Sequence, residues 1–599
     1  MLILGLNAYH GDASACLVVD GKLIAAAEEE RFRRIKHWAG FPSDAIRYCL
    51  TEGRVGLSDI DHVAINSDPR ANLLRRLTYT AMHRPSPRLV LNRLFNQRRR
   101  LSIEAELKRL YSSGCVKAAV HRVEHHLAHL ASCFLVSPFR EAVALSVDGF
   151  GDFSSTAWGI GTDTSMRIDG RVYFPHSLGI FYEAMTQYLG FPHYGDEYKV
   201  MGLAPYGDPI YLNEMQNLVG LNEDGSFALN LDYFRHHKEP VSFQWDDGVP
   251  EIGPLYSGRL DQLLGPRRSA SEPLEVRHRD IARSVQVMYE EAFFHLLNKL
   301  HANYNVDDLT LAGGCAMNSV ANGKVRRMTP FRRLYVQSAA GDAGGAIGAA
   351  IHVWHRLNGR SSFFLSSHAP GAAGNPWQTR FVMDHAYLGP QYRDDEIALL
   401  VKELSHELEA KAYEVERIRG DAELCDRTAE AIAKGLVIGW FQGRMEWGPR
   451  ALGNRSIICD PRRKDMKEIL NRKIKRRESF RPFAPSILRE HVAEWFEEEA
   501  DVPFMMQVFQ VREEKRALIP AVTHVDGSGR LQTVHSTTNP LYYRLIEGFR
   551  RRTGVPIVLN TSFNENEPVV CRPQEALDCF LRTKMDWVVL QDWIVRRCE

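Results

Sequence analysis

Three things are scarce in this sequence: charge of one sign, clustered cysteine and long hydrophobic runs. The 75 Lys and Arg balance 74 Asp and Glu to a net charge of +1, which gives no overall attraction to nucleic acid or an anionic membrane. The ten cysteines lack the close pairs of a disulfide framework or a zinc site, which indicates a reducing compartment. No segment reaches the roughly 18 apolar residues of a membrane span. Because no basic leader precedes the first strand, we expect a cytoplasmic protein.

What is present is enough chain for several domains. Of the 599 residues, 44% are hydrophobic, so each domain can bury a core of its own. We expect a first α/β domain at 1–358, a linker rich in Ser, Gly and Pro at 359–392, and a second α/β domain at 393–599.

Residues 68–115 are predicted to be a helical insertion in the first domain. Between 70 and 110 the insertion carries eleven Lys and Arg against two Glu, with apolar residues at helical spacing. Two interpretations are open. The apolar stripe packs on the domain, or the basic face binds an acidic ligand or nucleic acid.

A histidine pair indicates a metal site. His125 and His129 lie one turn apart on one face of a predicted helix, where two imidazoles can bind one ion. The apolar run 142–147 is typical of a buried strand and brings Asp148 to its end as a third ligand. Asp342 can supply a fourth, which completes a nitrogen and oxygen set suited to Fe(II), Mn(II) or Zn(II). The alternative is that these are ordinary packed or solvated histidines.

A repeated plan of short strands indicates a duplicated fold. Strands are predicted at 2–6, 14–19 and 22–27, and again at 142–147, 155–159 and 172–174. Each set contains an Asp-Gly pair, Asp20-Gly21 and Asp169-Gly170, which we interpret as a hairpin turn. Two hairpin sheets with facing loops are similar to the actin, hexokinase and sugar-kinase type of fold.

Two glycine turns follow predicted buried strands. The strand 309–312 runs into Gly313-Gly314, and the strand 334–337 is followed by a second glycine turn ahead of a helix. Backbone N–H groups and a helix start at such a turn can bind an anion such as a nucleotide phosphate. The candidates for nucleotide binding are Gly313, Gly314, Asn318 and Gly344.

The second domain concentrates arginine in loops. Residues 443–456 place three arginines among glycines, and residues 471–485 continue the basic pattern. Forked guanidinium donors in such loops can be set to bind phosphate or carboxylate oxygens. A solvated basic face is the alternative. The candidate residues for this anion pocket are Arg450, Lys475, Arg481, Arg530, Asn560 and Ser562.

Together these motifs resemble the O-carbamoyltransferase family of nodulation-factor and antibiotic biosynthesis. The matching stretches are 2–37, 124–130, 148–152, 313–318, 341–345, 443–456, 479–485 and 560–564. The resemblance covers nearly the whole chain. It implies an actin-like (ASKHA) duplicated domain, as in the tRNA threonylcarbamoyl transferases, followed by a threonylcarbamoyl-AMP-synthase-like α/β domain.

The resemblance also implies a reaction and its cofactors. Carbamoyl phosphate and ATP would give carbamoyl-adenylate in the second domain, and the first would transfer the carbamoyl group to a hydroxyl of a small-molecule natural product. Fe(II) or another divalent metal would bind in the transfer domain, and ATP would enter with Mg²⁺. The implied partners are carbamoyl phosphate, ATP and the acceptor, with neither membrane nor nucleic acid; a homo-oligomer is left open.

Residue roles carry over by motif. The metal ligands would be His125, His129, Asp148 and Asp342. His10 would take the proton of the acceptor hydroxyl, with Lys36 as a basic residue near it. Lys475, Arg481, Arg530 and Ser562 match the carbamoyl phosphate pocket. One departure is that Gly11 separates His10 from Asp12, where some members have His directly before Asp.

Three other functions remain open from the sequence. A tRNA threonylcarbamoyl transferase-like enzyme is supported only by the basic region 70–110, and its binding to tRNA would weaken steeply with salt. A sugar kinase of the same superfold leaves the arginines of the second domain unexplained. A non-catalytic sensor of carbamoyl phosphate or nucleotide would bind its ligand without releasing AMP.

Overall fold

The computed structural model describes residues 1–83, 103–110, 117–239, 243–244, 248–365, 380–410 and 412–597. This part of the chain divides into two compact units. The first comprises Met1–Asn318 and Val325–Met383, and the second comprises Ser319–Lys324 and Asp384–Glu599. Among the described helices, none has the length and apolar character that a bilayer crossing requires.

Five strands form the first sheet of the first unit, in the order β3-β2-β1-β4-β5. They are β3 (Lys22–Glu28), β2 (Ser14–Val19), β1 (Leu2–Asn7), β4 (His62–Ile65) and β5 (Ala119–Arg122). The first three form an antiparallel meander, and β4 and β5 continue parallel to β1. Helix α2 (Ser43–Gly53) covers β2 and β3 and closes an apolar core.

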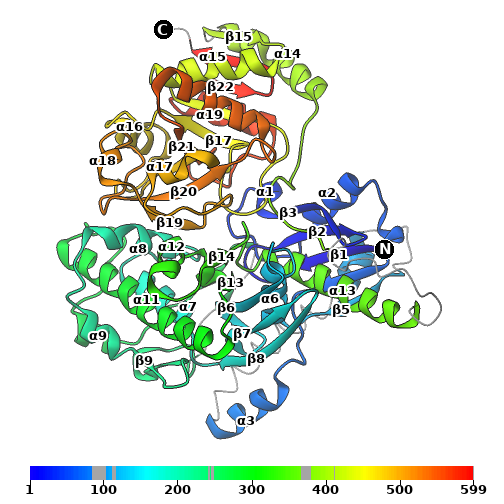
Figure 1. Cartoon of the computed structure of the whole chain (residues 1–599), viewed down its shortest axis with the longest axis vertical. Coiled ribbons are helices and arrows are strands. Elements are labelled where there is room, and N and C mark those ends of the chain that lie inside the picture. Colours follow the sequence, from blue (N-terminus) through cyan, green and yellow to red (C-terminus); the bar gives the residue numbers. More distant parts are fainter. Residues whose placement is uncertain are drawn as a thin grey trace. The chain divides into compact units, whose positions relative to one another are not determined.

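The second sheet repeats this topology. Its strands are β8 (Ser165–Tyr173), β7 (Ser154–Thr162), β6 (Glu141–Gly151), β13 (Asp308–Ala312) and β14 (Arg333–Tyr335), in that order. Again three strands are antiparallel, and β13 and β14 run parallel to β6. The predicted duplication is confirmed, and the first unit has the actin-like architecture (Figure 1).

Two helices join the sheets. Helix α6 (His125–Phe134) packs on β6, β7 and β13, helix α13 (Gly344–Leu365) packs on β1, β2 and β4, and the two helices pack on each other. Their backbones approach closely at Gly348, where an added Cβ would lie 1.8 Å from the carbonyl oxygen of Ala128. This close crossing holds the start of α6 beside the loops that follow β6 and β14.

One predicted turn is wrong. The hairpin between β7 and β8 turns at residues 163–164, and Asp169 and Gly170 lie inside β8. Gly170 has a packing role instead, because an added Cβ would lie 2.2 Å from the ring of Trp158 on the neighbouring strand. A glycine that makes room for a cross-strand aromatic ring has the same sequence signature as a glycine in a turn.

The basic insertion is described only in part. Helices α3 (Leu73–His83) and α5 (Ile103–Leu110) are described, whereas 84–102 and 111–116 lie outside the described residues. In α5, Ile103 and Leu107 are buried, as the packing interpretation predicts. In α3 the packing interpretation holds only in part. Tyr79 packs against Phe153 and Phe174, with ring centroids 5.8 and 5.2 Å apart, whereas Leu74 and Met82 are 76% and 75% exposed.

The predicted linker also differs from the structure at its start. Helix α13 extends to Leu365, past the expected beginning of the linker at 359. Residues 366–379 of the predicted linker lie outside the described residues.

The second unit is built on one mixed sheet of nine strands. In order these are β15 (Tyr413–Arg417), β23 (Trp593–Arg597), β22 (Trp587–Leu590), β16 (Ile438–Phe441), β17 (Arg455–Cys459), β21 (Ile557–Ser562), β18 (Ala484–Leu488), β20 (Ser528–Val534) and β19 (Gln507–Gln510). The helices that accompany the sheet include α14 (Asp394–Ala410), α15 (Asp421–Ala433), α19 (Pro540–Thr553) and α20 (Pro573–Arg582). They enclose a separate apolar core, so the second unit has an α/β fold of its own.

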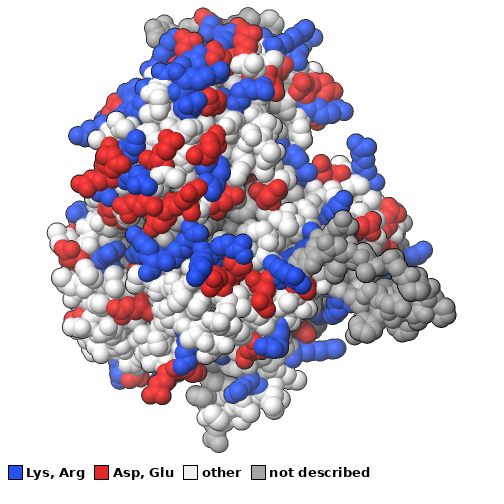
Figure 2. Space-filling view, in the orientation of Figure 1, with Lys and Arg blue, Asp and Glu red and all other residues white. Residues whose placement is uncertain are grey.

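Surface charge is mixed in sign. Figure 2 shows Lys and Arg interspersed with Asp and Glu on the face in view, as expected from a net charge of +1. Specific binding must therefore come from local groups of side chains rather than from the field of the whole molecule.

Candidate functional site

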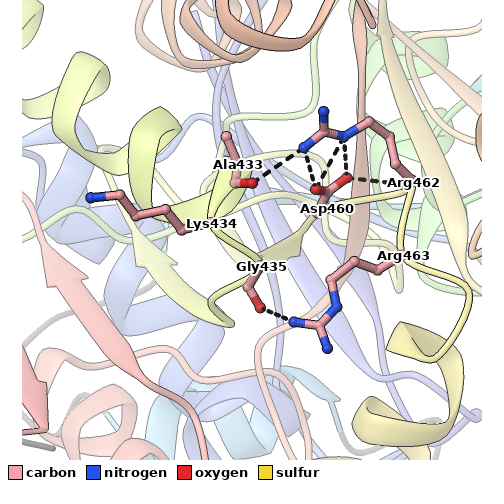
Figure 3. Close-up of a pocket in the computed structure, with 6 residues that line it drawn as sticks. All are labelled: Ala433, Lys434, Gly435, Asp460, Arg462 and Arg463. Atoms are coloured by element: carbon pink, nitrogen blue, oxygen red, sulfur yellow. Dashed lines mark hydrogen bonds and ion pairs between the residues drawn. The ribbon is translucent and has the colours of Figure 1, made fainter.

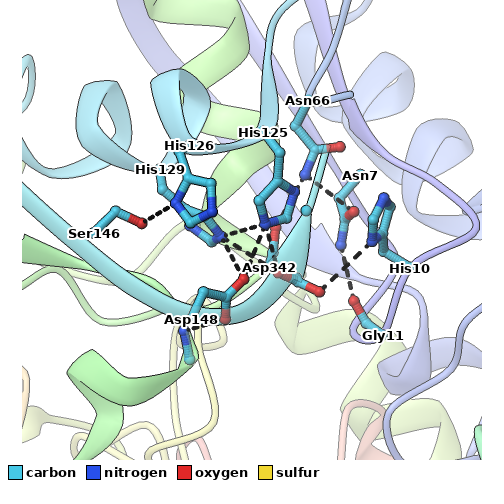
Figure 4. A network of polar contacts seen from close by, with 12 residues as sticks. Asn7, His10, Gly11, Asn66, His125, His126, His129, Ser146, Asp148 and Asp342 are labelled. Carbon is cyan, nitrogen blue, oxygen red and sulfur yellow. Dashed lines mark hydrogen bonds and ion pairs between the residues drawn. The ribbon is translucent and has the colours of Figure 1, made fainter. Parts of the chain in front are cut away.

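Two imidazoles and two carboxylates converge in the first unit (Figure 4). His125 Nε2 lies 3.0 Å from His129 Nε2 and 2.9 Å from Asp148 Oδ2. Asp342 Oδ1 lies 3.6 Å and 3.4 Å from the two Nε2 atoms, in the same order. One ligand atom from each residue lies within 4.8 Å of all the others. The predicted set of four is therefore brought together around one point.

Local structure explains how the histidines are aimed. Glu124 caps α6 by accepting a hydrogen bond from the N–H of Leu127 at 2.9 Å. The carboxylate of Asp152 accepts the N–H of His125 at 3.0 Å and so fixes the first turn of the helix. Gly151 leaves room for the His125 ring, which an added Cβ would approach to 2.0 Å.

The positions of the two carboxylates, Asp148 and Asp342, are also set by the surrounding structure. The N–H of Gly314 donates to Asp148 Oδ1 at 2.8 Å, which leaves Oδ2 for the histidines. Asp342 lies in the loop before α13, and its Oδ1 is buried and faces His129 Nε2 at 3.4 Å. A buried acceptor of this kind, facing two imidazole nitrogens, fits a divalent cation of the Fe(II), Mn(II) or Zn(II) type.

The pKa values of His129 and Asp148 reflect how close the four side chains lie. Burial alone would lower the pKa of His129, but hydrogen bonds to Asp148 and Asp342 raise it to about 9. Despite burial, the two histidines hold the pKa of Asp148 well below its usual range. Without a cation, His129 therefore keeps its proton at neutral pH.

Metal loading should release that proton. At pH 7.5 we expect about one proton to leave per ion bound, because the ligating nitrogens must be unprotonated. Calorimetric titration with Mn²⁺ or Zn²⁺ in two buffers of different ionisation enthalpy measures the number. A binding enthalpy that does not depend on the buffer would contradict a protonated His129.

His10 lies beside this centre. Its Nδ1 is 3.9 Å from Asp342 Oδ2, and its ring stacks on that of His125 with centroids 5.3 Å apart. Asn7 braces the loop by donating to the carbonyls of Gly11 and Asp12 at 3.0 and 2.9 Å. Gly11 is needed here, since an added Cβ would lie 2.4 Å from the hydroxyl of Tyr194.

Lys36, predicted as a basic residue near His10, lies in the segment after β3. Lys36 has an exposed side chain. Its neighbour His37, which the sequence did not single out, lies 2.8 Å through Nδ1 from Asp12 Oδ1, and its N–H donates to Glu30 at 2.8 Å. Burial would lower the pKa of His37, but Asp12 raises it to about 9. His37 and Asp12 are brought together by a hairpin and belong to no periodic sequence pattern, so the sequence alone does not reveal their contact.

The two glycine turns are each held by local hydrogen bonds. The first is followed by a short 3-10 helix, Gly314–Met317, and the N–H of Gly314 is already bonded to Asp148. Asn318 exchanges two hydrogen bonds with the side chain of Gln286, at 3.1 and 3.2 Å. Gly344 begins α13, and its N–H donates to the carbonyl of Gly341 at 3.0 Å.

Cationic side chains gather in the second unit. Burial, together with the nearby Arg450, Arg477 and Arg481, lowers the pKa of Arg530 well below its usual range. The Arg530 Nε is buried and has no acceptor in the described part of the chain. Arg481 has Glu478 as a partner, at 3.6 Å. Positive charge held together in this way fits an anionic ligand that neutralises it.

Lys475 is bonded to the protein itself. Its ammonium donates to the carbonyl and side-chain oxygens of Asn564 at 2.8 and 2.7 Å, and to Ser562. Burial, followed by Arg477 and Arg481, lowers its pKa well below the usual range. Nearby, Asn560 donates to the carbonyl of Ala451 at 3.0 Å, while its buried Oδ1 finds no donor among the described residues.

A separate hollow of about 390 Å³ carries basic groups that are already paired (Figure 3). It is lined by Ala433, Lys434, Gly435, Asp460, Arg462 and Arg463. Asp460 accepts from the Arg462 guanidinium at 2.7 Å, and Arg463 donates to Asp465 at 2.6 Å. This hollow therefore differs from the surroundings of Arg530, whose Nε has no acceptor among the described residues.

Comparison with known proteins matches both units. Residues 2–351 match the family model described as Carbamoyltransferase N-terminus, and residues 429–597 match Carbamoyltransferase C-terminus. The uncharacterized protein sll1178 of Synechocystis sp. is 39% identical and aligns with 99% of this chain and 96% of its own.

Relatives with descriptive names include a nodulation protein and a carbamoyltransferase. Nodulation protein NolNO of Sinorhizobium fredii is 38% identical over 99% of this chain and 80% of its own. The 3'-hydroxymethylcephem-O-carbamoyltransferase of Amycolatopsis lactamdurans is 32% identical over 48% of this chain and 49% of its own. With both units matched and relatives aligned along nearly the full length, the chain belongs to the carbamoyltransferase family of enzymes.

Proposed function

We propose that the protein is an ATP-dependent O-carbamoyltransferase acting on a small-molecule natural product. In the second unit, carbamoyl phosphate and water give carbamate and phosphate, and carbamate attacks ATP to give carbamoyl-adenylate and pyrophosphate. In the first unit, a hydroxyl of the acceptor attacks the carbamoyl carbon and AMP leaves. A tRNA substrate and a sugar-kinase reaction are less well supported, because neither uses the cations of the second unit.

One observation carries this proposal: each unit has a separate site whose charge fits one half of the reaction. The first unit combines a four-ligand cation cradle with a neighbouring histidine. The second concentrates guanidinium groups that repel one another. Transfer from an adenylate needs the first kind of site, and the handling of two phosphate compounds needs the second.

In the second unit the cations would bind and orient the phosphates. Arg450, Arg481 and Arg530 offer forked donors to phosphate oxygens, where charge accumulates as pyrophosphate leaves. The Oδ1 of Asn560 is an acceptor suited to the carbamoyl NH₂ group. Lys475 would act through its charge and by holding Ser562, because its own N–H groups are already bonded.

In the first unit, His10 would accept the proton of the acceptor hydroxyl, which is too weak a nucleophile alone. Asp342 lies 3.9 Å from His10 Nδ1 and can stabilise the imidazolium that forms. A divalent metal, Fe(II) by the family resemblance, would be held by His125, His129, Asp148 and Asp342 and would supply positive charge beside the adenylate phosphate. Lys36 is proposed as an auxiliary cation, and the Gly313 and Gly344 turns with Asn318 as the nucleotide-facing loops.

The direct test is mass spectrometry of the purified protein with ATP, carbamoyl phosphate and an extract of its source. A product heavier by one carbamoyl group, formed only with both co-substrates, is the expected result. AMP and pyrophosphate should appear together with it. A phosphorylated product would instead favour a kinase.

Replacing His10 with alanine should separate the two half-reactions. We expect transfer to fall by about 10²- to 10⁴-fold, the usual contribution of a general base. Pyrophosphate release should be unchanged, since His10 belongs to the first unit. Separate assays of AMP and pyrophosphate measure the split. Equal losses in both would argue against this role.

A further inference from the structure

We propose that Glu446 is the positioning residue of the arginine loop, defined as residues 442–454 between β16 and β17. Its buried carboxylate would fix the loop backbone so that the Arg450 guanidinium stays directed at the cation cluster of the second unit. The inference rests on the proposed function, because it gives that anion site its shape. Glu446 itself would touch neither substrate.

One oxygen of the Glu446 carboxylate accepts hydrogen bonds from three main-chain N–H groups. Glu446 is 3% exposed, and its Oε1 accepts the N–H groups of Leu452, Asn454 and Arg455 at 2.8, 2.7 and 3.1 Å. Three donors on one oxygen need the full negative charge of a carboxylate, and charge-assisted bonds of this kind are about twice as strong as neutral ones. The loop therefore wraps around Glu446 immediately after Arg450.

A buried cation holds the loop from its other side. Arg455 is fully buried and donates to four carbonyls, those of Gln442, Gly443, Asn454 and Pro390. Its guanidinium also lies 3.7 Å from the centre of the Phe441 ring. Main-chain groups contact both buried charges: three N–H groups donate to Glu446 Oε1, and four carbonyls accept from the Arg455 guanidinium. Together they fix both ends of the arginine loop.

The sheet holds the middle of the loop. Gln532 and Tyr387 donate to the carbonyl of Leu452 at 2.8 and 2.9 Å, and Asn560 donates to that of Ala451 at 3.0 Å. Every peptide from 451 to 455 thus has a bond to a fixed side chain or to Glu446. Arg450 is the last residue before this braced segment, and it is close enough to Arg530 to lower its pKa.

The physical need for such bracing follows from charge. Arg450 and Arg530 carry like charges and lie close enough for Arg450 to lower the pKa of Arg530, so the two guanidinium groups repel each other. In a rigid loop the repulsion between the guanidinium groups lowers the stability of the folded, unliganded protein. An anion that binds between them relieves this repulsion. A misplacement of about 1 Å can cost up to 10²-fold in rate.

The test is a double-mutant cycle with Arg450. We expect E446A to raise the KM for carbamoyl phosphate by about 30-fold and E446Q, which keeps one acceptor oxygen, by about 5-fold. If Glu446 acts through Arg450, the E446A/R450A double variant will bind no more weakly than R450A alone. Additive losses in the double variant, or an unchanged KM in E446A, would overturn the proposal. If E446A fails to fold, the cycle is run with E446Q.

Asp586 offers a matched control. It also accepts a main-chain N–H, that of Val437 at 2.7 Å, but at the opposite end of β16. D586N should lower the melting temperature without changing KM. The affinity for inorganic pyrophosphate, measured by calorimetry, tests the role of Glu446 independently of the proposed enzymatic function. If the wild-type protein never turns over carbamoyl phosphate, the proposed function is wrong. The role of Glu446 is tested separately: E446A should bind pyrophosphate more weakly than D586N does. Equal binding by the two variants would refute the role of Glu446.

Discussion

An alanine at position 129 is expected to remove the metal and stop carbamoyl transfer while leaving pyrophosphate release intact. His129 Nε2 lies 3.0 Å from His125 Nε2 and 3.4 Å from each of Asp148 and Asp342, so its loss opens one side of the cradle. Transfer should fall at least about 100-fold, since even residues that only support a ligand cost 10- to 100-fold. Metal analysis of the purified variant, with separate AMP and pyrophosphate assays, measures both effects.

His126 is the matched control for this variant. It is as buried as His129 and lies on the same helix, but its Nδ1 faces Ser146 Oγ at 3.0 Å. Burial lowers its pKa to about 4, so it is neutral at pH 7. H126A should lose stability through the cavity it creates yet keep its metal. A His129→Ala protein that keeps both metal and transfer would remove His129 from the centre.

The elements that were predicted well are those whose signal is local. The apolar run before Asp148 becomes the central strand β6, and the spacing of His125 and His129 places both rings on one face of α6. Duplication of the sheets follows from the repeated strand plan. In each case the residues that make the pattern are neighbours in the sequence, so a period of two or of 3.6 is enough to reveal it.

Contacts between distant segments were not predictable. Asp152 ends one of the stretches that carry the family resemblance, 148–152, but its bond to the N–H of His125 depends on how β6 returns past α6. His37 meets Asp12 only because a hairpin brings them together. Gly170 was misread as a turn residue because its partner, Trp158, lies on another strand. Side chains that orient a site often carry no signal in the sequence until the topology is known.

Replacing Arg530 with glutamine should move affinity and stability in opposite directions. Loss of a desolvated guanidinium from an anion site costs about 3 kcal/mol, so the KM for carbamoyl phosphate should rise by roughly 100-fold. The same change removes a cation that Arg450, Arg477 and Arg481 repel and whose Nε has no acceptor in the described residues. We therefore expect the free energy of unfolding to increase by about 1 kcal/mol in the absence of ligand. Denaturant unfolding and steady-state pyrophosphate release measure the two quantities.

Arg462 distinguishes this effect from a general loss of positive charge. It lies past the opposite end of β17 and is paired with Asp460 at 2.7 Å, so R462Q should lower stability and leave KM unchanged. If the Arg530 cluster serves to bind an anion, the free energy of unfolding should rise in the Arg530→Gln protein and fall in R462Q. The reason is that the repulsion within the cluster is offset only when an anion is bound. A destabilised Arg530→Gln protein with normal KM would instead make Arg530 a structural residue, and the anion pocket would have to lie elsewhere in the second unit.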